Sequence, residues 1–223
     1  QVIGVDIAER MVEALRQRAD AAGLPQVTAA RMDAEQLALS DGSFDVVLCG
    51  LGLMYLPDPV QALQEIKRVL RPGGRTALAV WGERARCGWA PLFGIVDAEV
   101  RSEVCPLFFA LGQGDALAHL CRSVGLTVRS DRRLTGTIDH ANSHQACDAA
   151  FAGGPVALAW QRFDKPTRER ARARYLDAIA IWQQDSGYRI PAEFVVVSAM
   201  APCASGKTTA TSSRSEEHTS ELQ

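Results

Sequence analysis

The sequence predicts an α/β fold in which a doubly wound sheet carries helices on both faces, and three observations lead to this fold class. Over residues 1–81, short apolar runs alternate with longer segments whose apolar residues recur every three or four positions. Two of the apolar runs are continuous, as is typical of strands that are covered on both faces. With 223 residues and 47% hydrophobic side chains, the chain can bury one sizeable core. The alternation predicts a parallel sheet in a single domain.

The first part of the chain contains the best-marked elements. Strands are predicted over residues 2–6, 26–32, 44–50 and 75–81, and helices over residues 8–22 and 59–70. The first helix carries an apolar stripe at steps of three and four, and Gly23 can take the left-handed conformation that ends it. In the second helix Asp58 can cap the first turn and Pro59 suits the first helical position. Pro72, followed by two glycines, stops this helix.

Beyond Gly82 the alternation weakens and helices predominate. Helices are expected near residues 90–110, 115–124, 144–152 and 166–184, and strands near residues 126–138 and 193–199. We expect the mostly helical insertion over approximately residues 83–190 to form a lid over a site at the sheet edge, with plain structural cover as the alternative. The domain is predicted to extend over residues 1–202, followed by a polar, disordered tail at residues 203–223. The last ten residues resemble a translated sequencing adapter, so the tail is expected to be an artefact.

The composition of the chain indicates which kinds of ligand or partner it can bind. The 26 acidic and 24 basic residues are spread along the chain and give a net charge of −2, which argues against nucleic acid and against an anionic membrane surface. No apolar run reaches the roughly 20 residues of a membrane-spanning helix, so a cytoplasmic protein with a small-molecule substrate is expected. The six cysteines form no C-x-x-C pair and the four histidines match no zinc pattern, so no metal is expected. The oligomeric state is not indicated.

Asp6 is the first candidate functional residue. It closes the opening strand, and in a doubly wound nucleotide-binding fold the acidic residue at the end of the second strand accepts hydrogen bonds from ribose hydroxyls. A carboxylate suits this role because it only accepts hydrogen bonds. The alternative is that Asp6 caps the following helix, with Glu9 three residues later in a capping box. The residue by itself leaves both interpretations open.

Further motifs follow at the next strand ends. Asp33 comes one position after the strand at residues 26–32, in the stretch RMDAEQL, and the run FDVVLCGLGLMYLPDP leads into a helix that ends in EIKRVLRPGG. Together these motifs resemble the class I S-adenosylmethionine-dependent methyltransferases. The similarity is greatest to the small-molecule branch that includes the ubiquinone and menaquinone biosynthesis C-methyltransferases. The resemblance is strong over residues 2–81, and over residues 82–202 it concerns only the general layout.

The resemblance implies S-adenosylmethionine as the cofactor and gives several residues a role on its adenosine side. Asp6 would hold the ribose, Ile7 would pack on the adenine, and Met11 would lie nearby. Asp33 would accept a hydrogen bond from the adenine amine, and the Ala34 amide would meet a ring nitrogen. Without the resemblance, Ile7 and Met11 could simply be core residues, and Asp33 could be a turn residue.

On the methionine side, the resemblance implies that Cys49, Gly50 and Leu51 line the pocket. It also implies a first strand with a glycine-rich loop, E/D-x-G-x-G-x-G, that would lie before Gln1. The chain is therefore expected to be a fragment, with a Rossmann-like methyltransferase sheet lacking its first strand. In this fold the first strand lies between the second and the fourth, so its absence would leave a gap and the fragment is expected to bind the cofactor poorly.

The implied reaction is transfer of a methyl group to a small-molecule acceptor by in-line displacement, which depends mainly on positioning. A general base is required only where the acceptor must lose a proton. Tyr55, His140 and His144 are titratable candidates, but no catalytic residue is assigned. Two alternatives remain at this point: an NAD(P)-dependent oxidoreductase, which also reads ribose with an acidic residue, and a non-catalytic Rossmann-like domain.

An aromatic group in the expected lid fits a hydrophobic or aromatic acceptor, and it equally fits ordinary packing. Its members are Trp89, Phe93, Phe108, Phe109 and Trp160.

Overall fold

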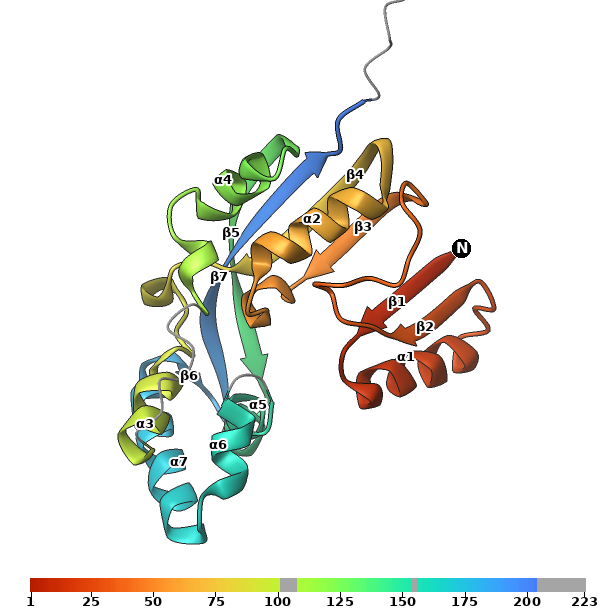
Figure 1. Ribbon diagram of the computed structural model, residues 1–223. Helices are drawn as coiled ribbons and strands as arrows, with labels where there is room; N and C mark the ends of the chain where they lie inside the picture. The colour runs from red at the N-terminus through yellow and green to blue at the C-terminus, as the bar shows by residue number, and fades with distance from the viewer. Residues whose placement is uncertain (101–107, 154–155, 204–223) are drawn as a thin grey trace, which may run out of the picture.

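The computed structural model describes residues 1–100, 108–153 and 156–203 (Figure 1). The helices are α1 (Glu9–Ala21), α2 (Pro59–Val69), α3 (Pro91–Glu99), α4 (Ala116–Ser123), α5 (Ser143–Phe151), α6 (Ala157–Arg162) and α7 (Lys165–Ile179). The strands are β1 (Val2–Asp6), β2 (Val27–Arg31), β3 (Phe44–Gly50), β4 (Leu70–Trp81), β5 (Thr127–His140), β6 (Gln183–Gln184) and β7 (Gly187–Met200). The predicted tail lies outside the described residues from residue 204 onward, as do Cys105 and part of the helix expected over residues 90–110.

The strands form two separate sheets. β1 and β2 pair in parallel, while a second sheet has the order β3-β4-β7-β5, with β6 paired to the end of β7. β1 and β3 run in the same direction and lie on facing edges of the two sheets (Figure 1). The prediction of a parallel sheet holds for β1–β2 and β3–β4, but it is wrong for β7, which is antiparallel to both of its neighbours. The periodicity of an apolar strand carries no information about direction, so this reversal could not be read from the sequence.

Most element boundaries agree with the sequence-based expectation. β1 and β3 have the predicted bounds, and α1 and α2 are each shorter than predicted at one or both ends. The N-terminus of α2 is built as expected, because Asp58 Oδ1 accepts a hydrogen bond from the Gln61 amide at 3.0 Å and Pro59 occupies the first turn. β4 begins at Leu70, five residues earlier than predicted. The short helix α6 has no counterpart among the predictions.

The main core lies on one face of the five-stranded sheet. Leu78 and Val80 of β4 pair in register with Val197 and Val195 of β7, and all four side chains are buried. Helices α2 and α4 pack on this face. On the opposite face of β3, Leu48 is 73% exposed. The expectation that β3 is covered on both faces is therefore wrong for the described residues, because this strand forms the edge of its sheet and no neighbour shields Leu48.

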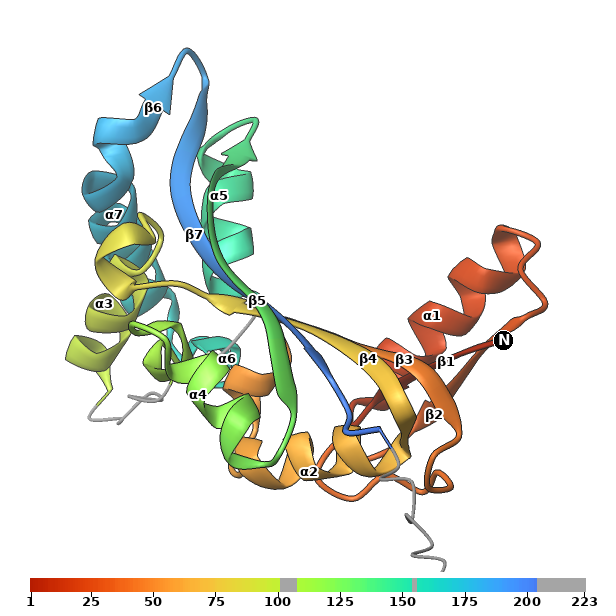
Figure 2. The same ribbon diagram turned by 90° about the horizontal axis from the view of Figure 1, so that it is seen from above.

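A helical region made of α3, α5, α6 and α7 is carried by the far halves of β5 and β7 (Figures 1 and 2). The two strands pair along their whole length, from Thr127 opposite Met200 to His140 opposite Tyr188. Phe151 and Tyr175 are buried at the centre of the helical region. The expected lid over residues 83–190 thus contains two different parts. β5 is a strand of the five-stranded sheet and α4 packs on that sheet, whereas α3, α5, α6 and α7 form the separate helical region.

The segment between β2 and β3 is tied to α2. Glu65 accepts a hydrogen bond from the Leu37 amide at 2.7 Å, and Arg68 donates to the carbonyl oxygens of Leu37 and Leu39. Arg68 also pairs with Glu65 at 2.7 Å. Hydrogen bonds from Arg68 hold the pKa of the Glu65 carboxyl below its usual range. This anchor fixes the path of the chain from the two-stranded sheet to the five-stranded one.

Candidate functional site

The carboxylate of Asp6 stands at the end of β1. Its Oδ1 accepts a hydrogen bond from the Ala8 amide at 2.8 Å, and none of the described donors bonds the other oxygen. The N-cap of α1 is Ala8, which makes no side-chain capping bond. The alternative that Asp6 and Glu9 form a capping box is therefore wrong. One carboxylate oxygen of Asp6 is left to accept hydrogen bonds from a ligand.

Asp33 lies at the same edge of the two-stranded sheet. The Met32 amide donates to the Asp6 carbonyl at 3.1 Å, so Asp33 follows immediately beyond the last bond between the two strands. Asp33 Oδ1 accepts a hydrogen bond from the Glu35 amide at 2.9 Å, which is the turn role considered for it. This bond occupies one oxygen only, and no described acceptor bonds the Ala34 amide. A turn role and a ligand role are thus compatible here.

Ile7 and Met11 do not belong to the core. Their residues are 62% and 59% exposed, although both side chains are large and apolar. The alternative that they are core residues is therefore wrong. Apolar side chains beside a strand end that carries free polar groups provide a surface on which a flat, partly polar ligand can pack.

The end of β3 turns sharply. Leu51 has a φ of 57°, a left-handed conformation that costs a bulky side chain about 1–2 kcal/mol, and its amide bonds the Ala79 carbonyl at 2.8 Å. Backbone strain of this kind concentrates at functional sites. Gly50, just before the turn, is exposed, and a side chain added there would meet nothing within 4 Å. The backbone at this strand end is open to a ligand.

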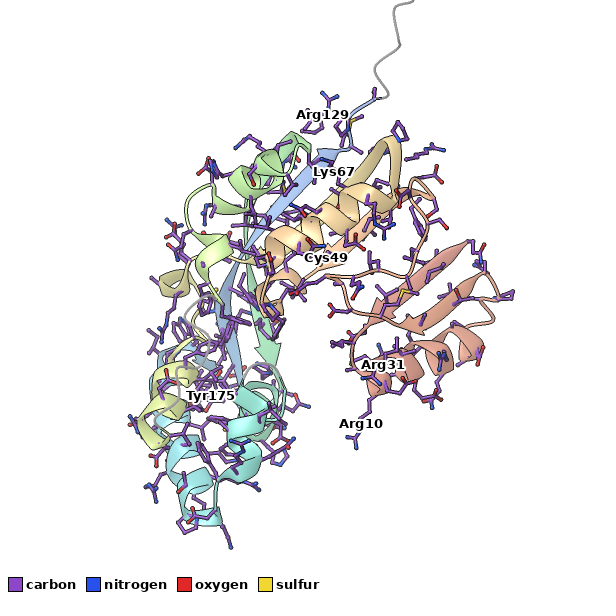
Figure 3. All side chains as sticks on the ribbon, viewed as in Figure 1. Arg10, Arg31, Cys49, Lys67, Arg129 and Tyr175 are labelled. Atoms are coloured by element: carbon purple, nitrogen blue, oxygen red, sulfur yellow. The ribbon has the colours of Figure 1, made fainter. Side chains whose placement is uncertain are left out.

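Cys49 differs from its two neighbours. Its thiol is directed toward the turn at Gly52, where an added Cβ would lie 3.0 Å from the sulfur, and burial raises the pKa of the thiol. Figure 3 shows Cys49 beside the core of the five-stranded sheet, away from Arg31 of β2. The structure therefore brings Asp6 and Asp33 together at one sheet edge and places Cys49, Gly50 and Leu51 on the other sheet.

The three titratable candidates for a general base are scattered. Tyr55 follows β3 and makes an edge-to-face contact with Phe108, with ring centroids 5.2 Å apart. Leu134 of β5 pairs with Phe194, which in turn pairs with Trp81 at the end of β4. His140 lies six residues further along β5, a distance of about 20 Å from the end of β4. His144 Nδ1 lies 3.0 Å from Asp148 on the outside of α5. Neither histidine is close to the strand ends that carry the candidate cofactor residues.

A buried ionic cluster at the end of β4 is absent from the sequence-based expectations. Glu193 of β7 is 1% exposed and accepts a hydrogen bond from Arg133 at 2.8 Å and another from the Glu83 amide at 3.0 Å. Arg86 approaches its second oxygen at 3.4 Å. The signal was a glutamate directly before the apolar run FVVVSAM. The role of this glutamate depends on Arg133 and Arg86, which lie 60 and 107 residues earlier in the sequence. A local sequence pattern cannot predict such distant partners.

The aromatic group of the expected lid is only partly assembled. Trp89, Phe93, Phe108 and Phe109 contact one another with ring centroids 5.3–6.1 Å apart. Trp160 is not part of this cluster, because it stacks on Phe151 within the helical region. The cluster contains four of the five residues that the sequence singled out, and it contacts the end of β4 through Trp89, whose ring centroid lies 4.8 Å from that of Trp81.

No group of three histidine, cysteine or acidic side chains comes together as a metal site within residues 1–100, 108–153 and 156–203. The five described cysteines are unpaired, and burial raises the pKa of Cys121 to about 11. None of the described helices is long and apolar enough to cross a membrane.

Comparisons with known proteins identify relatives of this chain. Residues 1–78 match the family model of a methyltransferase domain. A demethylmenaquinone methyltransferase of Listeria welshimeri is 37% identical over 92 residues, which are 41% of this chain and 39% of the relative. The corresponding protein of Geobacillus kaustophilus is 36% identical over 93 residues, or 42% of this chain and 40% of the relative. The chain thus spans about two fifths of the length of these curated relatives.

The fold is also found among solved structures. A structure from Bacillus halodurans, described as that of a candidate methyltransferase, superposes with a TM-score of 0.61 at 17% identity, covering 91% of this chain and 84% of the other. The [4+2]-cyclase SpnF superposes with a TM-score of 0.54 at 18% identity, covering 91% and 66%. These likenesses concern the fold. Residues 1–78 are thus similar in sequence to methyltransferase domains and to the demethylmenaquinone methyltransferases, while the likeness of the longer chain to solved structures concerns its fold.

Proposed function

We propose that this protein transfers a methyl group from S-adenosylmethionine to a small-molecule acceptor. The observation that carries the proposal is the pair of carboxylates at one sheet edge, Asp6 and Asp33, each with an oxygen that no described donor bonds. They lie within the segment that matches the methyltransferase domain. None of the similar proteins named above is an oxidoreductase, so the comparisons lend no support to a nicotinamide cofactor.

The residues present fit the adenosine part of this cofactor. The free oxygen of Asp6 would accept from the ribose hydroxyls, and that of Asp33 from the adenine amine. The exposed side chains of Ile7 and Met11 would pack on the base. The open backbone at Gly50 would face the methionine part.

When bound, S-adenosylmethionine supplies an activated methyl group with a neutral leaving group. The task of the protein is then to hold the acceptor in line with the methyl group and to exclude water. Within the aromatic cluster at the end of β4, only Trp89 is partly buried and would be available to the acceptor, because Phe93, Phe108 and Phe109 are buried in the core. No side chain is assigned as a catalytic base.

Residues 1–223 alone are expected to bind the cofactor weakly. The support is the arrangement of the sheets, because β1 and β3 present facing edges that are not hydrogen-bonded to one another. The candidate residues at the two edges are therefore not held at a fixed separation by a continuous sheet. A site whose two halves are not held together loses affinity because binding must order them.

The experiment is a calorimetric titration with S-adenosylmethionine, performed side by side on residues 1–223 and on the full product of the gene. In whichever form binds, Asp6→Asn and Asp33→Asn should each weaken binding about tenfold or more, since a charged hydrogen-bond acceptor is lost. Asp20→Asn, which removes an equal charge from the end of α1, is the control. Equal affinity of all four proteins would refute the proposed cofactor site. Micromolar binding by residues 1–223 would refute the expected weakness of this chain.

A further inference from the structure

The outer edge of β5 is a long strand edge without a strand beside it in the described part of the chain. β5 contains 14 residues, and its inner side pairs with β7 from Thr127 to His140. No strand within residues 1–100, 108–153 and 156–203 pairs with its outer side. An unpaired edge of this kind is a template for pairing with a strand of another chain. About 45 Å of strand is available for such a contact.

The middle of this edge is open on both faces of the sheet. Residues 131–137 are all exposed, and Leu134 at their centre is a large apolar residue that is 47% exposed. A side chain added at Gly136 would meet nothing within 4 Å. α4 lies beside the start of β5 and α5 beside its end, so the helices flank this exposed stretch (Figure 1).

A second copy of β5 can pair with this edge in the antiparallel sense. A two-fold axis perpendicular to the sheet keeps every side chain on its own face, so one residue must lie opposite itself at the axis. With Leu134 in this position, the two exposed leucines meet as a cross-strand pair. The charged residues near the axis then lie opposite uncharged ones: Asp131 opposite Thr137, Arg132 opposite Gly136 and Arg133 opposite Thr135.

Neighbouring registers oppose like charges. A centre at Asp131, Arg132 or Arg133 places that residue opposite its own copy. A centre at Thr135 places Asp131 opposite Asp139. Like charges that lie directly opposite one another destabilise a strand pair. The charge pattern of β5 therefore favours the register centred on Leu134 over those on either side of it.

The main competing register is centred on Gly136 and places Arg133 opposite Asp139. Both side chains already have partners on β7, because Arg133 pairs with Glu193 at 2.8 Å and Asp139 with Arg189 at 3.2 Å. The register centred on Leu134 does not require either pair to break. A centre beyond Gly136 would use only the end of β5.

We infer that this chain forms a two-fold dimer in which β5 pairs with β5 of a second copy around Leu134, joining the two five-stranded sheets into one. The irregularity between Val128 and Ser130 limits the regular pairing to Ser130 and the residues that follow it as far as Ile138. Such an interface is small, so a dissociation constant of about 10–100 μM is expected.

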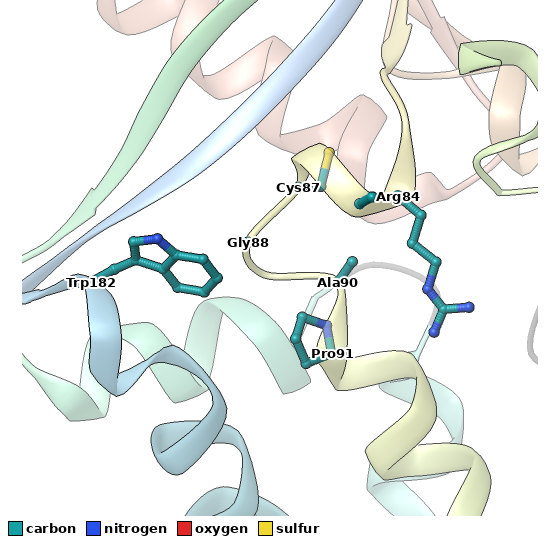
Figure 4. A pocket seen from close by; sticks show the side chains of 7 residues that line it. Arg84, Cys87, Gly88, Ala90, Pro91 and Trp182 are labelled. Carbon is teal, nitrogen blue, oxygen red and sulfur yellow. The ribbon is translucent and has the colours of Figure 1, made fainter. Parts of the chain in front are cut away.

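The dimer leaves the open cavity beyond the end of β4 accessible. This cavity of about 480 Å³ is lined by residues between Arg84 and Pro91 and by Trp182, and no residue of β5 contributes to it (Figure 4). Pairing of β5 also leaves Asp6 and Asp33 uncovered, because they lie on the other sheet. The inference is therefore independent of the proposed cofactor site.

The test is sedimentation velocity on residues 1–223 from about 2 to about 500 μM, with two charge variants at the axis. Leu134→Lys and Leu134→Asp should each weaken the dimer about tenfold or more, because two like charges would lie opposite one another. An equimolar mixture of the two variants should regain the dimer, since lysine then lies opposite aspartate. Leu158→Lys and Leu158→Asp, which alter a residue that is 71% exposed on α6, should leave the dimer unchanged.

The mixture makes the test specific to this register. The inference is overturned if the unmodified chain stays monomeric at every concentration, or if the dimer persists in both Leu134 variants. In the second case the contact would use another surface, such as the edges of β1 and β3. A mixture that dimerises no better than either variant alone would also overturn it, because residues 134 of the two copies would not be opposite one another. Circular dichroism of each variant verifies that it is folded.

Discussion

The two sheets differ in how many buried apolar side chains pack on them. In the β1–α1–β2 unit the buried apolar residues are Val12 and Ala19, whereas the five-stranded sheet and its helices bury a large connected core that includes Leu63, Leu78 and Val197. This unit and the turn that follows it nevertheless carry five of the candidate cofactor residues, namely Asp6, Ile7, Met11, Asp33 and Ala34. Ligand-binding segments are commonly drawn from the less stable parts of a protein. The comparison teaches that the site depends on a region with little packing of its own.

The largest expected change in stability comes from truncating a buried side chain, and we compare one such substitution in the five-stranded sheet with one in the β1–α1–β2 unit. Leu78→Ala should lower the free energy of unfolding by about 3 kcal/mol, because it leaves a cavity in a fully buried position. Val12→Ala should change the main unfolding transition by less than about 1 kcal/mol and instead speed amide hydrogen exchange within residues 2–31 about tenfold, through local opening. Chemical denaturation and hydrogen exchange measure the two quantities.

A matched control for these substitutions is Leu158→Ala, since Leu158 is 71% exposed and its removal should cost less than about 0.5 kcal/mol. If Val12→Ala lowered the free energy of the main unfolding transition as much as Leu78→Ala, the two regions would unfold as one cooperative unit. The inference that the β1–α1–β2 unit opens on its own would then be wrong.

An intermediate effect is expected at the anchor between the two regions. Glu65→Gln should destabilise the protein by about 2 kcal/mol at neutral pH, because the partly buried carboxylate accepts from Arg68 and from the Leu37 amide. The folded-state pKa of Glu65 is lowered, so its contribution is present above the unfolded pKa of about 4.3 and is lost as the pH falls through the folded value. Denaturation curves at pH 7 and at pH 3 measure this dependence.

The difference between Glu65→Gln and the unmodified chain should therefore shrink as the solution is acidified. Glu169→Gln removes an exposed carboxylate that lies 3.9 Å from Lys165 and should show neither the loss nor the pH dependence. A Glu65→Gln penalty that stays constant down to pH 3 would contradict the role assigned to the charge.

The smallest effect concerns the helix ends. α2 is capped by Asp58, while α1 begins at Ala8 with extended backbone and no side-chain cap. Asp58→Ala should cost about 1 kcal/mol, and Ala8→Ser should stabilise α1 by about 0.5 kcal/mol because serine can bond a free amide of the first turn. Hydrogen exchange of the α1 amides measures the second change. Unaltered exchange in Ala8→Ser would show that packing, and not capping, limits the stability of this unit.

Much of the fold could be predicted from residues 1–81, because each element there carries its own signals. The strand at residues 44–50 is a continuous apolar run, and α2 has a cap and an initial proline. The predicted stop at Pro72 and the two glycines was wrong in its position, since α2 ends at Val69 and β4 already begins at Leu70. The antiparallel direction of β7 was not predictable, since it depends on which strands become neighbours. For the same reason the exposure of Leu48 was missed, because burial of a strand depends on what lies beside it.

The candidate site was predictable to a similar degree. Asp6 and Asp33 were chosen as candidates from their positions after strands, and the structure places them at one edge. The ionic cluster of Glu193 and Arg133 was not found, since its members come together only through the pairing of β5 with β7. Patterns that are local in sequence reveal strand ends, while clusters between distant segments require the structure.

The long pairing of β5 with β7 determines how the two halves of the main body can move. β4 pairs with β7 only as far as Phe194, so between Glu193 and Arg189 three hydrogen-bonded strands become a ribbon of two, before β6 pairs with the end of β7. A two-stranded ribbon twists and bends more readily than a wider sheet. Glu193 lies directly at this transition and joins it to Arg133 and to the loop after β4. Any movement of the helical region toward the sheet must therefore bend β5 and β7 at Glu193, where the hydrogen bonds of this residue hold the strands and the loop together.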